Sequence, residues 1–330
     1  AVHPPAGLPF LTHLPSRIKA ARIEDVVLGT SFQAPVFSEY YGDGSKLGLR
    51  LRYVTEEEPL GTGGAIRNVL GELTADTILV FNGDVLGGTD VRQVLDTHRT
   101  SGADVTMHLV RVSDPRAFGC VPTDETGRVT DFLEKTQDPP TDQINAGAYV
   151  FRRSIIEQIP EGRPVSVERE VFPGLLSSGV HIQGHVDYSY WRDMGTPEDF
   201  VRGSADLVRG IAPSPALGDR RGGSLVHEGA GVGPGALLIG GTVVGRGAEI
   251  GPGARLDGAV VFDGAVIEAG AVVERSIVGF GARLGPRALV RDTVIGDGAD
   301  IGARCELLRG ARVWPGVTIP DNGIRFSSDI

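Results

Sequence analysis

The stretch Val244-Gly245-Arg246-Gly247-Ala248-Glu249-Ile250-Gly251-Pro252-Gly253-Ala254-Arg255-Leu256 sets an aliphatic residue at every sixth position. The same step, interrupted by three steps of five, continues through the last third of the chain at Val232, Leu238, Val244, Ile250, Leu256, Phe262, Ile267, Val273, Val278, Leu284, Val290, Ile295, Ile301, Leu307, Val313 and Ile319. Short strands joined by tight glycine turns would stack these side chains into one inner column. A glycine-rich linker is the alternative, but linkers have no regular aliphatic period. The repeat therefore predicts a solenoid of stacked coils over residues 225–330.

The preceding part of the chain has a different pattern, in which strand-like and helical runs alternate. Strands are expected at 25–28, 49–54, 77–81 and 103–109, and helices at 10–21, 64–73 and 91–99. This alternation predicts an α/β doubly wound, mostly parallel sheet with ligands bound beyond the carboxyl ends of its strands. We expect a catalytic domain over residues 1–212, a linker over 213–224 and the repeat domain over 225–330.

Composition excludes several classes of partner. The 330 residues carry a net charge of −10 without a lysine- or arginine-rich block, which argues against nucleic acid and anionic membranes. Apolar runs fall well short of the roughly 20 residues that span a membrane, and a secretory leader is not recognisable, so we expect a cytoplasmic protein. Cys120 and Cys305 lack metal-ligand spacing and are expected to be buried thiols.

A glycine-rich turn with three carboxylates stands at Thr55-Glu56-Glu57-Glu58-Pro59-Leu60-Gly61-Thr62-Gly63-Gly64. Glycines allow a flat ligand to lie against the backbone, because no Cβ interferes. Carboxylates can only accept hydrogen bonds. The segment therefore suits a planar ligand that presents donors, such as a nucleobase.

Two aspartates stand where strands are expected to end. Asp84 follows the apolar run 79–81 and Asn82-Gly83, and Asp193 precedes Thr196 and Pro197, which fit the N-cap and first position of a helix. Such an aspartate can also be a turn or helix cap. Together, two carboxylates from distant strand ends could hold Mg²⁺, which prefers oxygen ligands and keeps waters and substrate phosphates.

Three further polar residues are candidates for substrate contacts. Glu134 and Lys135 place a carboxylate beside a cation, and Asn145 places a neutral amide at a strand start. An amide suits sugar hydroxyls, because it both donates and accepts. A solvated charge pair and a turn-forming asparagine are the alternatives, and both stay open.

Taken in order, six segments resemble the motifs of the sugar-1-phosphate nucleotidyltransferase family. They are Glu56…Gly61-Thr62-Gly63, Asn82-Gly83-Asp84, Phe118-Gly119, Glu134-Lys135, Asn145-Ala146-Gly147 and Asp193-x-Gly195-Thr196. The run Ser166–Pro173 resembles the mannose-1-phosphate guanylyltransferase subgroup, and the repeat resembles the hexapeptide, left-handed parallel β-helix. The resemblance covers nearly the whole chain.

The resemblance implies a role for each matching residue. Asp84 and Asp193 would hold Mg²⁺ as cofactor, and Lys135 would contact the sugar phosphate. Residues implied for the nucleotide are Glu56, Gly61, Thr62, Gly63 and Gly83, and residues implied for the sugar are Gly119, Glu134, Asn145 and Gly147. The implied partners are GTP, mannose 1-phosphate, GDP-mannose and pyrophosphate.

The chain departs from the family at one place. Members begin with a strand and a phosphate loop, Gly-x-Gly-Thr-Arg followed by Pro-Lys-Pro, and neither stands in this sequence. Residues 6–13 match the family pattern immediately after that loop, and Ala1-Val2 could be a remnant of the first strand. We expect a further segment between about Val2 and His3, or ahead of the chain, because the triphosphate otherwise has no cradle.

The first carboxylate of the glycine-rich turn suggests which base is used. Members of the family that use uracil or thymine carry glutamine five residues before the turn glycine, and this chain has Glu56 five residues before Gly61. Guanine presents N1–H and its 2-amino group side by side, and one carboxylate can accept both. We hypothesise that Glu56 selects GTP, while Glu57 and Glu58 face solvent or cap the turn.

The expected reaction is a Mg²⁺-dependent transfer of GMP from GTP to mannose 1-phosphate. Alternatives are another sugar phosphate, glucose 1-phosphate being nearest, another base, or a non-catalytic subunit that senses nucleotide sugars. An acyltransferase is disfavoured, because such hexapeptide enzymes commonly use a histidine and none follows His227. Strand edges at the ends of a β-helix need covering, so a homo-oligomer is expected.

Overall fold

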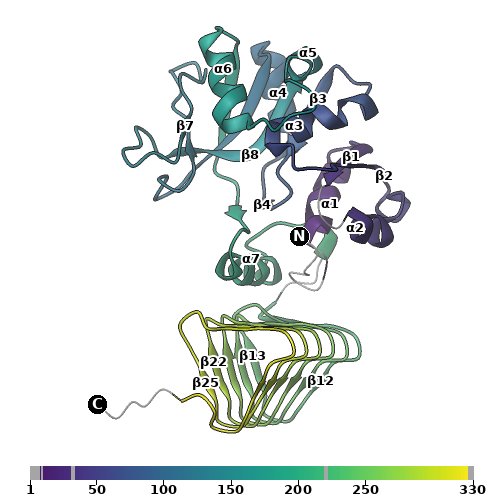
Figure 1. Cartoon of the computed structure of the whole chain (residues 1–330), viewed down its shortest axis with the longest axis vertical. Coiled ribbons are helices and arrows are strands. Elements are labelled where there is room, and N and C mark those ends of the chain that lie inside the picture. The colour runs from purple at the N-terminus through teal and green to yellow at the C-terminus, as the bar shows by residue number, and fades with distance from the viewer. Residues whose placement is uncertain (1–7, 9, 31–33, 219–221, 326–330) are drawn as a thin grey trace. The chain divides into compact units, whose positions relative to one another are not determined.

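The computed structural model describes residue 8 and residues 10–30, 34–218 and 222–325. Its contacts divide the chain into two units (Figure 1). One comprises Leu14–Trp191, and the other comprises Arg192–Ile330 together with Ala1–His13. Among the described residues, none of the helices has the length and apolar character needed to cross a membrane. The division predicted at residues 212 and 225 stays a prediction.

A mixed sheet forms the centre of the Leu14–Trp191 unit. Its strands run in the order β7 (Leu133–Glu134), β6 (Gly119–Cys120), β8 (Gln143–Arg152), β5 (Val105–Arg111) and β9 (Ile182–Asp187), with β3 (Thr77–Phe81) also paired to β8. β5 and β9 are parallel, whereas β8 runs antiparallel to both β3 and β5. A separate parallel pair joins β1 (Asp25–Thr30) to β2 (Arg50–Thr55), and β4 (Val85–Gly87) follows β3. The predicted α/β fold class is confirmed, and the strands predicted near 25, 50, 77 and 105 are present. The sheet is mixed and not mostly parallel, because β8 pairs antiparallel with β3, β5 and β6.

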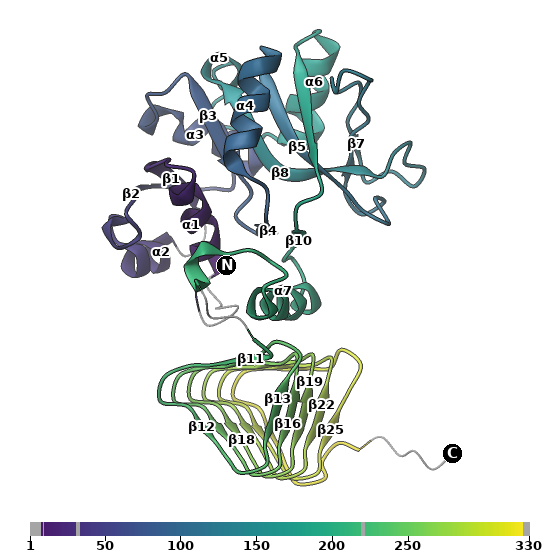
Figure 2. The ribbon, with the colours of Figure 1, turned by 180° about the vertical axis from the view of Figure 1, so that it is seen from behind.

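Helices cover both faces of this sheet. Val105, Met107 and Leu109 face a core shared with α3 (Gly61–Asn68) and α6 (Phe172–Ser177). The alternate residues of β5 face α4 (Val91–Ser101), which contacts β5 and β9. Figures 1 and 2 show these two faces in turn. The remaining helices are α1 (His13–Ala20), α2 (Ala34–Tyr41) and α5 (Arg153–Ile156), with 3₁₀ turns at Phe10–Thr12, Ser45–Leu47 and Val69–Glu72.

A bulge in β8 shapes the carboxyl end of β3. Tyr149 lies opposite Met107 and Asn145 opposite Leu109, so the intervening residues of β8 leave the ladder with β5, while Ala148 stays paired with Phe81 of β3. Gly147, in this bulge, has a φ of +74°, and its carbonyl accepts the Asn82 N–H at 2.8 Å. A Cβ at Gly147 would lie 2.9 Å from Asn82 Nδ2, so only glycine fits here.

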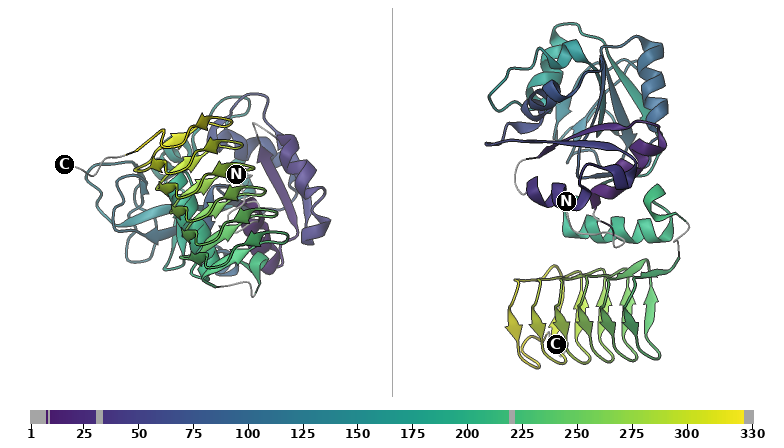
Figure 3. Two further views of the ribbon diagram at one scale, coloured as in Figure 1. Left: turned by 90° about the horizontal axis from the view of Figure 1, so that it is seen from below. Right: turned by 90° about the vertical axis from the view of Figure 1, so that its right-hand side faces the viewer.

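The second unit contains a parallel β-helix, as the repeat predicted. Its three sheets have the orders β11-β14-β17-β20-β23-β26, β12-β15-β18-β21-β24-β27 and β13-β16-β19-β22-β25. Figure 3 shows the coils stacked side by side. Their bounds are β11 Ser224–Val226, β12 Gly231–Val232, β13 Leu237–Ile239, β14 Thr242–Val244, β15 Glu249–Ile250, β16 Arg255–Asp257, β17 Val260–Val261, β18 Val266–Ile267, β19 Val272–Glu274, β20 Ile277–Val278, β21 Arg283–Leu284, β22 Leu289–Arg291, β23 Val294–Ile295, β24 Asp300–Ile301, β25 Glu306–Leu307, β26 Arg312–Val313 and β27 Thr318–Ile319.

Most of the predicted inner residues lie in the core of the β-helix, but two do not fit. Phe262 was the wrong choice, because Val261 occupies the inner position, in register with Val244 and Val278. Val232 is in register with Ile250 but is 44% exposed, because β12 is the edge strand of its sheet. A second set of inner residues, mostly alanine, was not predicted. Its buried members are Ala248, Ala254, Ala259, Ala265, Ala271, Ala282, Ala288, Ala299 and Cys305.

Helix α7 (Pro197–Arg209) lies on the β-helix and contacts β11 and β14. It begins as predicted, since Thr196 is the N-cap and its hydroxyl accepts the Asp199 N–H at 3.1 Å. Val201 of α7 is buried with Phe262 and Val260. The side chain of Phe262 therefore faces outward from the β-helix because it packs against α7.

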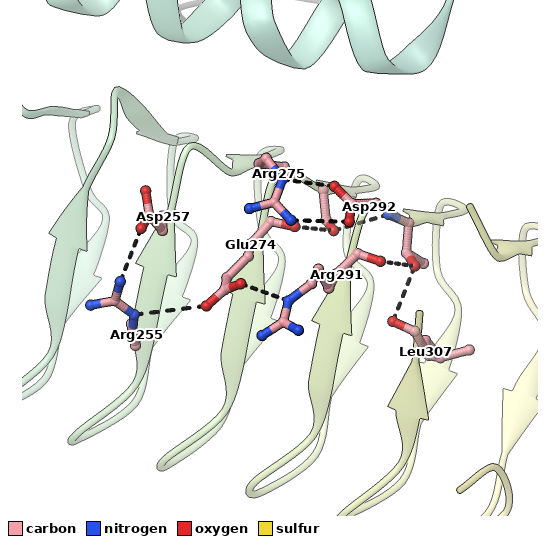
Figure 4. Close-up of polar contacts among 9 residues, drawn as sticks. Arg255, Asp257, Glu274, Arg275, Arg291, Asp292 and Leu307 are labelled. Atoms are coloured by element: carbon pink, nitrogen blue, oxygen red, sulfur yellow. Dashed lines mark hydrogen bonds and ion pairs between the residues drawn. The ribbon is translucent and has the colours of Figure 1, made fainter. Parts of the chain in front are cut away.

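An ion-pair ladder crosses neighbouring coils of the β-helix (Figure 4). Glu274 pairs with Arg291 at 2.7 Å and lies 3.9 Å from Arg255. Arg275 pairs with Asp292, 17 residues later and one coil along, at 2.7 Å. A coil of 17 residues combines two steps of six with one of five, which explains the five-residue steps in the sequence.

Candidate active site

The glycine-rich turn is the start of helix α3. The helix begins at Gly61, three residues before the position expected from the pattern. Glu56 bonds to the N-cap residue of this helix, because its Oε2 accepts the Leu60 N–H at 3.0 Å. Glu57 and Glu58 are exposed, as expected. Each carboxylate oxygen can accept two hydrogen bonds, so this bond leaves Glu56 able to bind a ligand.

The glycines of this turn have a packing role as well. Gly61 has a φ of +69°, and a Cβ there would lie 2.7 Å from the Val165 carbonyl oxygen. The N–H of Gly63 donates to the same oxygen at 2.8 Å. The turn is thus fixed against the segment around Val165, which explains why α3 starts earlier than the pattern suggested.

Asp84 lies on the exposed turn that joins β3 to β4. Gly83 and Asp84 are both exposed, and Asn82 before them is held by the bulge at Gly147. The turn stands at the carboxyl end of β3, where ligands bind in folds of this type. The bulge therefore brings Gly147 and Asn145 next to the segment that carries Asp84.

Gly119 and Glu134 are cross-strand neighbours in β6 and β7. A Cβ at Gly119 would lie 2.7 Å from Phe132 Cζ and 3.1 Å from Glu134 Oε2, so the glycine leaves room for that carboxylate. Burial raises the pKa of Glu134, which Lys135 opposes. Lys135 itself has a left-handed φ of +51°, a conformation uncommon outside glycine and often found at functional sites.

Asn145 is bonded at both ends of its amide. Its Nδ2 donates to the Tyr149 hydroxyl at 2.6 Å, and its Oδ1 accepts the Gly147 N–H at 3.0 Å. Burial raises the pKa of Tyr149 well above its usual range. The carboxylates of Glu134 and Asp84 add to that increase, which places them within electrostatic reach of this ring.

Asp193 belongs to the other unit, at the end of β10 (Trp191–Asp193). Its Oδ1 accepts the Gly195 N–H at 2.8 Å, which holds the turn before α7. All other predicted site residues lie in the Leu14–Trp191 unit. The phosphate-loop prediction concerns the chain around Val2 and His3, which lies outside the described residues.

The donor set suits a magnesium ion bound largely by substrate. Within the part of the chain that the structure describes, histidine, cysteine, aspartate and glutamate do not gather in threes as a metal site. A metal held by one or two carboxylates plus phosphates and water is the arrangement that Mg²⁺ favours. The exposed carboxylate of Asp84 at a strand end fits that requirement.

A polar network beside this edge was not predicted; in it, buried His108 and Thr89 bond to half-buried Asp187. Asp187 accepts hydrogen bonds from His108 Nε2 at 2.9 Å and from Thr89 Oγ1 at 2.5 Å. Burial lowers the pKa of Arg17 to about 10, against the attraction of Asp187, and Arg17 donates to the Thr89 carbonyl at 2.7 Å. Arg17, Thr89 and His108 line a pocket with Asn82, Gly147 and Trp191. They are far apart in the sequence and share no motif, so no pattern marked them.

The comparisons with known proteins agree with this geometry. The family model Nucleotidyl transferase matches residues 2–210, and the model GMPPB C-terminal domain matches residues 220–326. The chain is 74% identical over 328 residues, 99% of this chain and 91% of the relative, to a mannose-1-phosphate guanylyltransferase of Mycobacterium tuberculosis. It is 33% identical to a probable mannose-1-phosphate guanylyltransferase 3 of Arabidopsis thaliana, over 82% of this chain and 84% of the relative.

Solved structures resemble the chain in part. HddC from Yersinia pseudotuberculosis, also solved in complex with GMP-PN, matches with a TM-score of 0.56 and 26% identity over 62% of this chain and 88% of that chain. A putative glucose-1-phosphate thymidylyltransferase from Bacillus anthracis matches with a TM-score of 0.57 and 20% identity, covering 62% of this chain and 84% of that chain, which supports the fold alone.

Proposed function

The chain belongs to the nucleotidyl transferase family, and from this premise we propose that it transfers GMP from GTP to mannose 1-phosphate, forming GDP-mannose and pyrophosphate. The observation that carries the proposal is the 74% identity, over 99% of the chain, to the mannose-1-phosphate guanylyltransferase of Mycobacterium tuberculosis. A match of this extent includes both the catalytic part and the repeat.

Guanine is the base that the glycine-rich turn suits best. Glu56 is held at the start of α3, where its carboxylate accepts the Leu60 N–H and retains further acceptor capacity. N1–H and the 2-amino group of guanine are adjacent donors that one carboxylate can accept together. The guanine-nucleotide complex of the related HddC supports this assignment.

The sugar is assigned to the strand ends around β6 and β8. Glu134 is half-buried beside Gly119, and Asn145 and Gly147 lie at the bulge of β8. Acceptor and amide groups of this kind suit the hydroxyl groups of a sugar. Lys135, next to Glu134, is the residue to which we assign the offset of the sugar-phosphate charge.

Catalysis by this site consists of positioning and charge neutralisation. An oxygen of the sugar phosphate attacks the α-phosphorus of GTP in line, and pyrophosphate leaves. Asp84 and Asp193 are the residues that would hold Mg²⁺, which supplies charge neutralisation at the phosphates when bound. No residue of the chain is required as a covalent nucleophile. We place the reaction in the cytoplasm, and we expect the active protein to be a homo-oligomer.

The test is formation of both products by the full-length protein. Purified protein with GTP, mannose 1-phosphate and Mg²⁺ is expected to yield GDP-mannose and pyrophosphate in equal amounts. Asp84→Asn is expected to lower turnover by several orders of magnitude with the fold unchanged. Asp96→Asn, on the exposed face of α4, is the matched control and should leave turnover unchanged. Absence of GDP-mannose with the wild type, or full turnover by Asp84→Asn, would refute the proposal.

A further inference from the structure

A π-helix lies directly against the proposed base-binding turn. The Val165 N–H donates to the Leu60 carbonyl at 2.8 Å, and Val167 donates its N–H to the Thr62 hydroxyl at 2.9 Å. Val167–Val171 (η5) forms a single turn of π-helix, a rare conformation that is frequent at functional sites. The start of η5 is therefore fixed to the residues that would hold the base.

Glu168 is the second residue of this π-helix, and its carboxylate is oriented by two hydroxyl groups. Oε2 of Glu168 accepts hydrogen bonds from Thr62 Oγ1 at 2.8 Å and from Ser166 Oγ at 3.0 Å. The side chain is half-buried. An oxygen of a carboxylate accepts about two hydrogen bonds, so the remaining capacity of Glu168 lies on Oε1.

The charge of the same carboxylate acts on residues assigned to the sugar and on Tyr149 beside them. Burial is the largest cause of the raised pKa of Glu134, and the positive charge of Lys135 opposes it. The negative charge of Glu168 comes next and raises this pKa further. The charge of Glu168 also contributes to the raised pKa of Tyr149, whose hydroxyl is bonded to Asn145. Glu168 thus bonds to the base turn on one side and acts electrostatically on the sugar residues on the other.

The chemistry of this pair of carboxylates favours a ligand rich in hydroxyl groups. The negative charge of Glu168 acts on Glu134, so two carboxylates of this region lie within electrostatic reach of each other. Carboxylates accept hydrogen bonds only, and each hydroxyl group of a sugar can donate one. We propose that Glu168 contacts the sugar directly, accepting a hydrogen bond from one sugar hydroxyl beside Glu134 while Thr62 holds its other oxygen. The inference rests on the proposed function and adds a specificity-determining residue to it.

The test removes the charge of Glu168 and, separately, each hydroxyl of the sugar. Steady-state kinetics of Glu168→Gln are measured at saturating GTP on mannose 1-phosphate and on its 2-, 3-, 4- and 6-deoxy analogues. A hydrogen bond to a charged group contributes about 1.5–3 kcal/mol, so kcat/KM on mannose 1-phosphate should fall about 10- to 100-fold. On the one analogue that lacks the bonded hydroxyl, Glu168→Gln and wild type should agree within about twofold, because neither can form that bond.

A purely structural role for Glu168 would give a different result. If it only holds Thr62, the loss would be equal on all five sugar phosphates and the KM for GTP would rise, and either outcome overturns the proposal. Glu170→Gln is the matched control in the same segment, because Glu170 is exposed and bonds to the Ser166 N–H and Arg163. Its kinetics on mannose 1-phosphate should equal those of the wild type.

Ser166→Ala keeps the proposal testable if Glu168→Gln does not fold. This variant removes one of the two bonds that orient Oε2 and leaves the carboxylate in place. We expect the KM for the sugar phosphate to rise a few-fold with the KM for GTP unchanged, and an unchanged KM for the sugar would overturn the inference. Wild-type protein that prefers a different sugar phosphate would contradict the proposed function alone, because the same hydroxyl-deletion series can then be run on that sugar.

Discussion

Asp187, which is half-buried, is the centre of the polar network beside the proposed active site, and we expect its replacement to destabilise the Leu14–Trp191 unit. In Asp187→Asn the size of the side chain is kept and its charge is lost. The carboxylate now accepts from His108 Nε2 at 2.9 Å, Thr89 Oγ1 at 2.5 Å and Ser189 Oγ at 2.7 Å. An asparagine offers one acceptor oxygen, and its NH₂ group would face donors.

The magnitude follows from the three side-chain hydrogen bonds. A bond to a charged group contributes about 1.5–3 kcal/mol and a neutral bond about 0.5–1.5 kcal/mol, so the loss is about 1 kcal/mol for each bond. We therefore expect Asp187→Asn to lower the free energy of unfolding by about 3 kcal/mol. Burial opposes ionisation of Asp187, but the bonds from His108 and Thr89 still lower its pKa. A lowered pKa stabilises the folded state above the unfolded pKa of about 4, and this stabilisation is lost as the pH falls below that value.

The assay is urea denaturation at pH 7, followed by tryptophan fluorescence. Trp191 belongs to the unit that contains Asp187, and Trp314 is 79% exposed, so the change in fluorescence reports mainly on that unit. Asp114→Asn is the matched control, because Asp114 makes an equally short ion pair with Arg116, at 2.6 Å, on the exposed surface. Exposed pairs contribute about 0–1 kcal/mol. We expect Asp187→Asn to lower the free energy of unfolding more than Asp114→Asn, because the partners of Asp187 are buried. An equal decrease in the two variants would refute this reasoning.

Three further predictions concern the sugar site and the β-helix. Gly119→Ala should raise the KM for the sugar phosphate about tenfold and leave the KM for GTP unchanged, because the new Cβ would lie 2.7 Å from Phe132 Cζ. If kinetic assays give the same KM for the sugar phosphate in the variant and the wild type, strand β6 moves to accommodate the methyl group and the prediction is wrong. Burial raises the pKa of Glu134, so its ionisation destabilises the folded state as the pH rises through that pKa. The melting temperature of Glu134→Gln minus that of the wild type should therefore increase from pH 4 to pH 7. A difference in melting temperature that stays constant over this pH range would contradict the prediction. Glu274→Ala should lower the free energy of unfolding, measured by thermal denaturation, by about 1–2 kcal/mol, because Glu274 is only 17% exposed and lies between two arginines. An unchanged free energy of unfolding would mean that the ion pair with Arg291 does not stabilise the β-helix.

The β-helix was predictable because every coil repeats the same physical requirement. An aliphatic residue recurs at each corner, often with a glycine after it, so an error at one position does not disturb the rest. The error at Phe262 arose where three apolar residues, 260–262, stand together within a five-residue step. Sequence alone does not say which of them faces inward, and the choice of Val261 depends on register and on α7 covering Phe262.

The candidate site was predictable where its residues stand in short motifs. Positive φ values and close contacts require glycine at positions such as Gly61 and Gly147, so these positions can be recognised in the sequence. Contacts between distant segments leave no such mark. The bond from Thr62 to Glu168 joins residues 106 apart, and that from His108 to Asp187 joins residues 79 apart. Their importance follows only from the folded arrangement.

Substrate preference of the full-length protein tests the central claim most directly. The measurement is kcat/KM for pyrophosphate release with GTP, ATP, UTP and dTTP, each combined with mannose 1-phosphate and with glucose 1-phosphate. Because a mismatched base leaves buried polar groups unpaired, GTP with mannose 1-phosphate should exceed every pairing with another base by about 100-fold or more, and it should also exceed GTP with glucose 1-phosphate. Equal or higher activity with UTP or dTTP, or with glucose 1-phosphate as the preferred acceptor, would contradict the assignment.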